Sequence, residues 1–150
     1  MKKLFLLFFM LLCSSFLRTY ASTWVQIDEN SYIDKDSIKN FSNEFGSINA
    51  NQKSFWTKYI GKEYYKNCEI NNMDYILTLN IIDYSNDTYS MKTIIVYDKD
   101  GKSIASDTVP NHRLHWENIV PDSRGEYYAE LVKNPDLLNK LYKNQTQNNK

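Results

Sequence analysis

Three extended segments between Met73 and Thr108, separated by short runs of turn residues, constrain the fold of this chain more than any other feature. Thr88–Tyr97 and Ile104–Thr108 are rich in β-branched and aromatic residues and predict two strands. Apolar and polar residues alternate in Met73–Asp83, and a period of two over this length predicts a half-buried strand. We therefore expect an antiparallel meander of three strands. In the first, Met73, Tyr75, Leu77, Leu79 and Ile81 fall on one face, and Asp74, Thr78 and Asn80 fall on the other.

The turn between the last two segments is predicted by Asp100-Gly101. This dipeptide tolerates the positive φ angles that a tight two-residue hairpin demands. The run Asp98–Gly101 also resembles the middle of a calcium-binding loop, but Val96 stands where such a loop needs its first acidic ligand. We therefore interpret this run as a hairpin turn without a metal ion.

The N-terminal half predicts further strands. Trp24–Ile27 and Tyr32–Ile33 predict a short hairpin, and a single turn is expected at Lys35–Ile38. Ser54–Ile60 alternates between its two faces and predicts another strand. Asn40–Lys53 is polar and contains a glycine, which predicts a loop.

The C-terminal part of the chain predicts helix. Ser123 and Glu126 have the spacing of a capping box, in which each side chain accepts a hydrogen bond from the other residue's backbone N–H. Strands followed by helix favour an α+β fold, with an antiparallel β-sheet and a C-terminal α-helix packed on one face. The residues expected to face the sheet recur at helical spacing; they are Tyr127, Tyr128, Leu131 and Val132.

Pro135 favours a second, short helix at Asp136–Tyr142. The polar residues 144–150 then predict a disordered tail. The folded part would be a single domain at residues 22–143, a length that fits one hydrophobic core.

Residues 1–21 have the features of a secretory signal peptide. A basic start precedes the apolar run Leu4–Leu12, and small residues precede Ser22, so we expect export to the periplasm, the outer surface or the medium. Lipid attachment at Cys13 is the alternative, which the bulky Leu12 before it disfavours. No transmembrane segment is expected in the mature chain.

Charge and cysteine content narrow the class of protein further. The leader contains three basic residues and no acid, so its removal lowers the formal charge from zero to −3. A mildly acidic domain has no electrostatic reason to bind nucleic acid. Cys68 is then the only cysteine, which excludes an internal disulfide.

No motif predicts a catalytic, cofactor or metal site. His112 and His115 lie beside Glu117, but the flanking prolines indicate a loop, where a His-x-x-His pair does not direct both rings to one ion. Cys68 as a nucleophile would need a basic neighbour and an orienting group, and neither is readable. We therefore expect no enzyme, no cofactor and no metal.

One aromatic patch is a candidate protein-binding site. Tyr59, Tyr64 and Tyr65 are flanked by charged residues, a combination that is common on recognition surfaces because a tyrosine ring contributes area at low entropic cost. The alternative is that these rings cover the edge of the core at the end of a strand.

Four stretches, read in order, resemble the sequence pattern of the surface-adhesin protein E family. The similarity extends from Trp24 to about Val132. The stretches are Trp24-Val25-Gln26-Ile27; Tyr32-Ile33-Asp34 with Ser37-Ile38; Tyr97-Asp98-Lys99-Asp100-Gly101-Lys102; and Trp116-Glu117-Asn118-Ile119-Val120-Pro121-Asp122-Ser123 with Glu126.

The resemblance implies an antiparallel sheet of about six strands with a C-terminal helix on one face, in a protein exported by a Gram-negative bacterium. The best known member binds host matrix and serum proteins. Members often tie the helix to the sheet by a disulfide, but this chain has no cysteine near Asp83 or in Gly125–Asn134, so apolar burial would hold the helix. The matched residues are expected to act as core anchors, turn and helix cap; they are Trp24, Asp34, Tyr97, Asp98, Gly101, Trp116, Pro121, Ser123 and Glu126.

The leading hypothesis is an exported, non-enzymatic binding module that contacts a host or envelope protein through a sheet face or the tyrosine patch. An alternative is a periplasmic structural or assembly factor that pairs through a sheet edge with itself, as a homodimer, or with an envelope protein. The weakest alternative is a small secreted enzyme.

Overall fold

The computed structural model describes residues 22–43, 45–61, 70 and 72–148. In this part the strands are β1 (Trp24–Gln26), β2 (Ser31–Asp34), β3 (Lys39–Ser42), β4 (Ile48–Ile60), β5 (Tyr75–Asp83), β6 (Thr88–Tyr97), β7 (Ser103–Thr108) and β8 (Glu117–Asn118). Two 3₁₀ turns are η1 (Lys35–Ser37) and η3 (Asn111–Arg113). The helices are α2 (Arg124–Lys133) and α3 (Pro135–Asn148).

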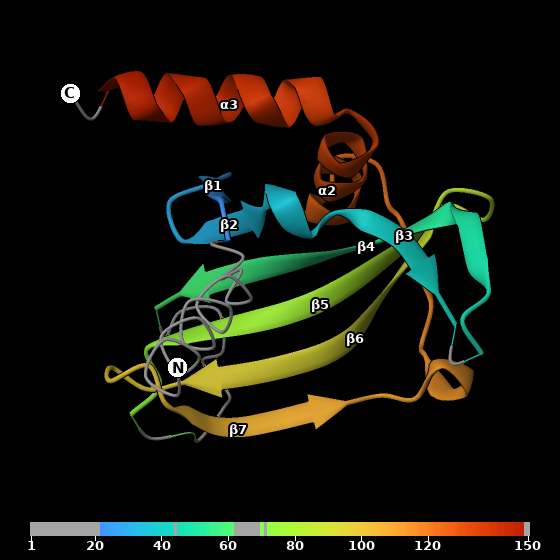
Figure 1. The fold of residues 1–150 in the computed structure, drawn as a ribbon, viewed down its shortest axis with the longest axis horizontal. Helices are drawn as coiled ribbons and strands as arrows, with labels where there is room; N and C mark the ends of the chain where they lie inside the picture. Colours follow the sequence, from blue (N-terminus) through green and yellow to red (C-terminus); the bar gives the residue numbers. More distant parts are fainter. Residues whose placement is uncertain (1–21, 44, 62–69, 71, 149–150) are drawn as a thin grey trace, which may run out of the picture.

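The eight described strands form one open antiparallel sheet with the order β1-β2-β4-β5-β6-β7 (Figure 1). β3 pairs with the first half of β4, and β8 pairs with β6. The predicted α+β fold and the meander β5-β6-β7 are confirmed. The signal peptide and Cys68 lie outside the described residues, so their roles stay predictions.

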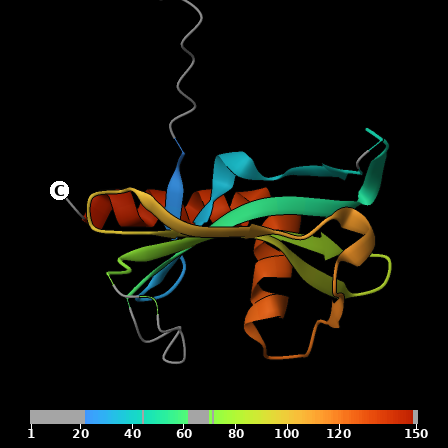
Figure 2. The same ribbon diagram turned by 90° about the horizontal axis from the view of Figure 1, so that it is seen from below.

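The two helices occupy different places around the sheet. Figure 2 shows α2 projecting from one face, and α3 runs beside β1 at the edge. Phe55 of β4 and Tyr128 of α2 meet in this layer with ring centroids 5.8 Å apart. The buried residues of this core are Val25, Ile33, Phe55, Tyr59 and Ile82 from the sheet, and Tyr128, Leu131, Val132 and Leu138 from the helices.

The register of β4 and β5 decides which side chains face the helices. Thr57 pairs with Thr78, so both lie on the same side as Phe55 and its partner Asn80. The alternating apolar residues of β5 lie on the opposite side, where Leu79 pairs with Trp56. The strand prediction was therefore correct. The polar residues of β5 can face the helices because a buried hydrogen-bond network satisfies them.

The predicted loop at Asn40–Lys53 is also wrong. β3 and the first half of β4 pair across a turn in which Asn43 Oδ1 accepts hydrogen bonds from two backbone N–H groups and Gly46 adopts φ of 78°. Residues 48–51 are exposed, so both sides of this hairpin meet solvent. The period-two signal fails here because no side has to be apolar.

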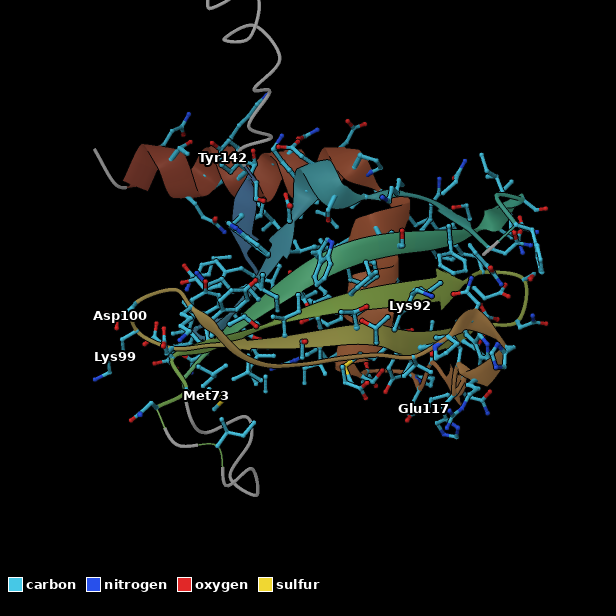
Figure 3. The ribbon with its side chains drawn as sticks, turned by 60° about the horizontal axis from the view of Figure 1, so that its bottom comes forward. Met73, Lys92, Lys99, Asp100, Glu117 and Tyr142 are labelled. Atoms are coloured by element: carbon cyan, nitrogen blue, oxygen red, sulfur yellow. The ribbon has the colours of Figure 1, made fainter. Side chains whose placement is uncertain are left out.

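The turn between β6 and β7 is longer than predicted. Asp98 Oδ1 accepts hydrogen bonds from the backbone of Asp100 and Lys102, and Gly101 has φ of 73°. Only one residue of the turn needs a positive φ, which is typical of a longer hairpin loop rather than a two-residue turn. Its tip, with Lys99 and Asp100, lies at the opposite side of the molecule from Glu117 (Figure 3).

The start of α2 matches the predicted cap in part. Ser123 Oγ accepts a hydrogen bond from Glu126 N at 3.2 Å, as predicted. The Glu126 carboxylate instead accepts from Asp122 N, at 2.7 Å. The capping box therefore reaches one residue farther back, and Asp122 adopts φ of 58° at this point.

The helical stripe is narrower than predicted, and the second helix is longer. Tyr128, Leu131 and Val132 are buried, but Tyr127 is 38% exposed. α3 continues through Asn148 instead of ending at Tyr142, so residues 144–148 are helical rather than a tail. Gln145 explains the extension, because its Oε1 accepts from Gln26 N (3.1 Å) and its Nε2 donates to Gln26 O (2.5 Å). These bonds fasten α3 to the backbone of β1.

Candidate functional site

A groove opens on the helix side of the sheet, between α2 and the centres of β5 and β6. Its floor is a hydrogen-bond network: Thr57 and Thr78 hydroxyls lie 2.6 Å apart, and Asn80 Nδ2 donates to both at 2.9 Å. Thr57 and Thr78 are buried. These bonds fix the plane of the Asn80 amide, since both donors of a side-chain amide lie on its nitrogen.

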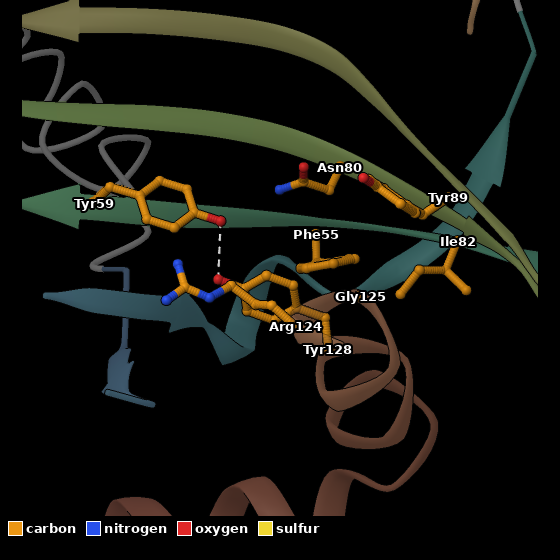
Figure 4. Close-up of a pocket in the computed structure, with 8 residues that line it drawn as sticks. All are labelled: Phe55, Tyr59, Asn80, Ile82, Tyr89, Arg124, Gly125 and Tyr128. Atoms are coloured by element: carbon orange, nitrogen blue, oxygen red, sulfur yellow. Dashed lines mark hydrogen bonds between the residues drawn. The ribbon is translucent and has the colours of Figure 1, made fainter. Parts of the chain in front are cut away.

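Tyrosine rings form the walls of the groove. The Tyr59 and Tyr128 hydroxyls hydrogen-bond at 2.9 Å, and Arg124 lies beside this pair with its guanidinium 6.0 Å from the Tyr59 ring centroid (Figure 4). Asn80 and Tyr89 lie on the sheet side of the cavity and face Arg124 and Tyr128 of α2 (Figure 4). The Tyr89 hydroxyl donates to Glu117 Oε2 at 2.6 Å, which fixes the carboxylate.

Two neighbouring cavities make up this groove. One, of about 160 Å³, lies against Phe55, Ile82 and the first turn of α2; the other, of about 360 Å³, extends toward His115 and Glu117. Tyr59, Asn80 and Tyr89 line both cavities, so the two adjoin.

Electrostatics keep the tyrosine hydroxyls of the groove protonated over a wide pH range. The hydrogen bond to Glu117, followed by burial, raises the pKa of Tyr89 to about 12. Burial and the neighbouring Tyr59 raise the pKa of Tyr128 far above its usual value. Arg124 is paired with Asp28 at 2.9 Å. The groove therefore presents neutral hydroxyls together with one compensated cation and one exposed carboxylate.

The opposite side of the sheet offers a surface of a different kind. We call the open face the part of this side formed by Trp56, Tyr75, Leu77, Leu79, Ile95 and Tyr97. All six are half-buried, α2 projects from the other side of the sheet (Figure 2), and α3 lies at the β1 edge. None belongs to the cores that pack under the helices or around Met73.

The two ends of the open face differ. At one end, Tyr75 stacks on Tyr97 with centroids 4.7 Å apart, and Lys58 Nζ lies 4.3 Å from the Tyr75 ring centroid. At the other end, Lys92 donates to Asn111 and lies near the Phe41 ring (Figure 3). The same side of the sheet is not exposed at this end, because Ser54, Ile81 and Ser90 are buried there.

The structure describes one of the three tyrosines of the predicted patch. Tyr59 is 7% exposed and points into the groove, so it does not stand on the outer surface. Tyr64 and Tyr65 lie outside the described residues, and a binding role for them stays a prediction.

The residues matched to the adhesin pattern hold local structure. Asp34 Oδ1 caps η1 by accepting from Thr23 N and Asp36 N. Trp24 and Trp116 are half-buried rather than core anchors, and Pro121 is exposed in the turn before α2. Tyr97 forms the stack on the open face, while Asp98, Gly101, Ser123 and Glu126 have the turn and cap roles given above.

The two histidines considered for a metal site do not form a cluster of ligands among the described residues. His115 Nε2 lies 3.9 Å from Glu117 Oε1, and both side chains are largely exposed. Within the described ranges, no group of three or more His, Cys, Asp or Glu side chains could hold a metal ion. No helix in that part of the chain is long and apolar enough to cross a membrane.

The groove was not predicted from the sequence. Asn80, Tyr89, Glu117 and Arg124 come from four separate elements, and no spacing along the chain joins them. A partial signal existed in Thr57, Thr78 and Asn80, because these polar residues occupy strand positions on one side of two adjacent strands.

Comparisons with known proteins indicate the fold. The chain is similar to the crystal structure of protein E from non-typeable Haemophilus influenzae, with a TM-score of 0.53 and 16% sequence identity over 83% of this chain and 90% of that one. Another structure of H. influenzae protein E gives a TM-score of 0.50 at 17% identity, over 75% of this chain and 84% of that one. No protein-family model and no curated protein matches the sequence. At these identities the similarity concerns the fold alone.

Proposed function

We propose that this chain is an exported, non-enzymatic binding module that contacts a protein partner through the open face. The observation that carries the proposal is the apolar character of this face on a sheet whose helices lie elsewhere. Contiguous apolar surface without a covering layer is typical of sites where another protein binds.

The composition of the open face fits an interface. Trp56, Tyr75 and Tyr97 supply aromatic area, and such residues carry much of the binding energy where proteins meet. Lys58 stands beside the tyrosine stack as a cation at the rim. A partner with an apolar centre and an acidic margin would therefore be complementary to this surface.

The fold supports the same class of function. The chain resembles the surface-adhesin protein E family in sequence pattern, and its fold is similar to that of protein E. Shared fold does not transfer a partner, so the partner is proposed only as an envelope or host protein. An enzyme is not favoured, because the two described histidines lie on an exposed loop without a nucleophile in contact.

A photo-crosslinking experiment tests the proposal in native cells. A photoreactive phenylalanine replaces Leu79 on the open face, and a second variant carries it at Val120, an exposed apolar position before α2. We expect adducts with a discrete protein from position 79, no such adduct from position 120, and loss of the adduct when Ile95→Lys is added. Equal adducts from both positions, or none from position 79, would contradict the proposal.

Protease treatment of intact cells tests export, with a periplasmic protein as the control for a closed envelope. Loss of the domain while the control survives supports a surface location. Survival of both supports the periplasm and directs the search to envelope partners.

The sheet-edge alternative has one structural observation in its favour. β7 pairs only with β6 in the described part of the chain, and most of its residues are exposed, whereas the β1 edge is occupied by Gln145 of α3. Exposed strand edges can recruit another strand. A photoreactive residue at Asp107 distinguishes the two modes, because edge pairing gives adducts there and not at Leu79.

A further inference from the structure

The groove beneath α2 has the size of a small-molecule site. Its second cavity is about 360 Å³, and it adjoins the first at Tyr59, Asn80 and Tyr89. Ligand pockets typically begin at about 300 Å³. The groove lies on the other side of the sheet from the open face, so its occupant is separate from the proposed protein partner.

The polar groups of the groove are fixed before any ligand arrives. Asn80 Nδ2 is committed to the two threonine hydroxyls, and its carbonyl oxygen accepts no hydrogen bond from any residue described. Glu117 keeps one oxygen on the Tyr89 hydroxyl, and its other oxygen lies 3.9 Å from an exposed histidine. Both side chains therefore present an acceptor in a set position.

Charge and hydrogen-bond chemistry narrow the ligand. Arg124 is neutralised by Asp28, and Glu117 would repel an anion. A purely apolar ligand would leave the Asn80 and Glu117 acceptors without partners when it covers them, which is unfavourable. The complementary ligand is neutral, donates hydrogen bonds in more than one direction, and has an apolar surface for the tyrosine rings.

Gly125 in the first turn of α2 widens the groove at its entrance. Its φ is not positive, and an added Cβ would lie 3.5 Å from Ser123 Oγ and 3.6 Å from Tyr89 Cδ1, which are ordinary contacts. Neither backbone strain nor a clash therefore requires glycine here. Glycine leaves the space beside the Tyr89 ring open, at a cost in helix propensity.

From these observations we infer that the groove binds one or two rings of a neutral glycan. A pyranose ring carries hydroxyl groups around its rim, which meet the Asn80 and Glu117 acceptors, and C–H groups on its faces, which pack on Tyr59 and Tyr89. Arg124 donates to the ring or glycosidic oxygens from the opposite wall.

Saturation-transfer NMR on the purified protein tests this inference with three probes. Lactose represents galactose-ended glycans, the N-acetylglucosamine disaccharide represents the N-acetylated glycans of cell walls, and sorbitol is the acyclic control with hydroxyls but no ring face. We expect saturable binding of at least one disaccharide and none of sorbitol. A ¹H–¹⁵N spectrum of the labelled protein should then show shifts of the Asn80, Tyr89 and Gly125 amides when that disaccharide is added. The disaccharide that binds more tightly identifies the source of the glycan.

Two variants connect the binding to the groove. Gly125→Leu fills the entrance and should weaken binding at least about tenfold, the equivalent of one lost hydrogen bond at a buried site, while Gly125→Ala should leave it nearly unchanged. Glu117→Ala, at a largely exposed position, should also weaken it about tenfold.

Three results would overturn the inference. They are no saturable binding of either disaccharide, equal binding of sorbitol, or unchanged affinity in Glu117→Ala. Gly125→Leu counts only if its melting temperature shows a folded protein, and Glu117→Ala decides the question if it does not.

Discussion

The two sides of the sheet differ in an unusual way: polar residues of β5 face the helix, and apolar residues of β5 face the side without one. On β5, the side beneath α2 carries Thr78 and Asn80, whereas the side without a helix carries Leu77 and Leu79. The polar pair is tolerated inside because Thr57 completes its hydrogen bonds. Burial in this protein therefore follows the availability of partners rather than the polarity of each residue.

The two sides of the sheet also offer two kinds of surface. The helix side is a packed core with a groove that has fixed polar groups, whereas the open face is apolar and has no covering element among the described residues. A groove of the first kind suits a small ligand, and a flat apolar face suits a protein. Matched substitutions on the two sides test this division.

The largest effect is expected from shortening one isoleucine on each side. Ile82→Ala removes a side chain that is 1% exposed beneath α2, and it should lower the free energy of unfolding by about 3 to 4 kcal/mol. Ile95→Ala on the half-buried open face should cost only about 1 kcal/mol. Urea denaturation of both variants measures the difference. Equal losses would mean that the open face is covered in the native protein.

Removing one hydroxyl from each side should have a smaller effect. Thr78→Val takes away the bond to Thr57 and one acceptor of Asn80, so we expect a loss of about 1 to 2 kcal/mol in unfolding free energy. The Thr93 hydroxyl lies on the open side and, among the described residues, accepts a single side-chain hydrogen bond, from Thr108 at 3.2 Å, so Thr93→Val should change stability by less than about 0.5 kcal/mol. Chemical denaturation compares them, and the reverse order would show that the buried network is not stabilising.

The cap of α2 tests how the helix is held over the groove. Ser123→Ala removes the acceptor of the Glu126 N–H and should lower the unfolding free energy by about 1 kcal/mol. Ser106→Ala on exposed β7 is the control and should leave stability unchanged. The photo-crosslink from Leu79 should persist in both variants, because the open face does not depend on α2. Its loss in Ser123→Ala alone would couple the two sides.

The smallest effect is a difference in alkaline stability. The pKa of Tyr89 is raised to about 12 in the folded protein, above the ordinary value of 10, so the fold holds this proton more tightly than the unfolded chain does. The resulting stabilisation is complete below pH 10 and is lost as pH rises from 10 to 12. Melting temperatures across this interval should fall more steeply in the native protein than in Tyr89→Phe. Parallel curves would show that the bond to Glu117 does not persist in solution.

Local signals predicted the three-strand meander and the start of the first helix. The alternation of β5, the Asp98–Gly101 turn and the spacing of Ser123 and Glu126 each depend on neighbours within a few residues. The direction in which β5 faces could not be obtained this way, since it depends on the register with β4 and on Thr57, 21 residues away from Thr78. Hydrophobic alternation reports a strand with two unlike sides and leaves open which side the helices cover.

The groove was unpredictable for a related reason. Arg124 and Tyr59 are neighbours only because α2 docks across the sheet, and Glu117 meets Tyr89 only because β8 pairs with β6. The open face, in contrast, was present in the sequence as the apolar positions of β5.

The contact between Gln145 and Gln26 brings the last helix back to the edge where the sheet begins. Any tag, tether or neighbouring domain joined at either end of the described chain therefore leaves from the same edge. Coupled to a sensor chip through its C-terminus, the protein will stand with β7 outward, and both the groove and the open face will remain accessible from solution.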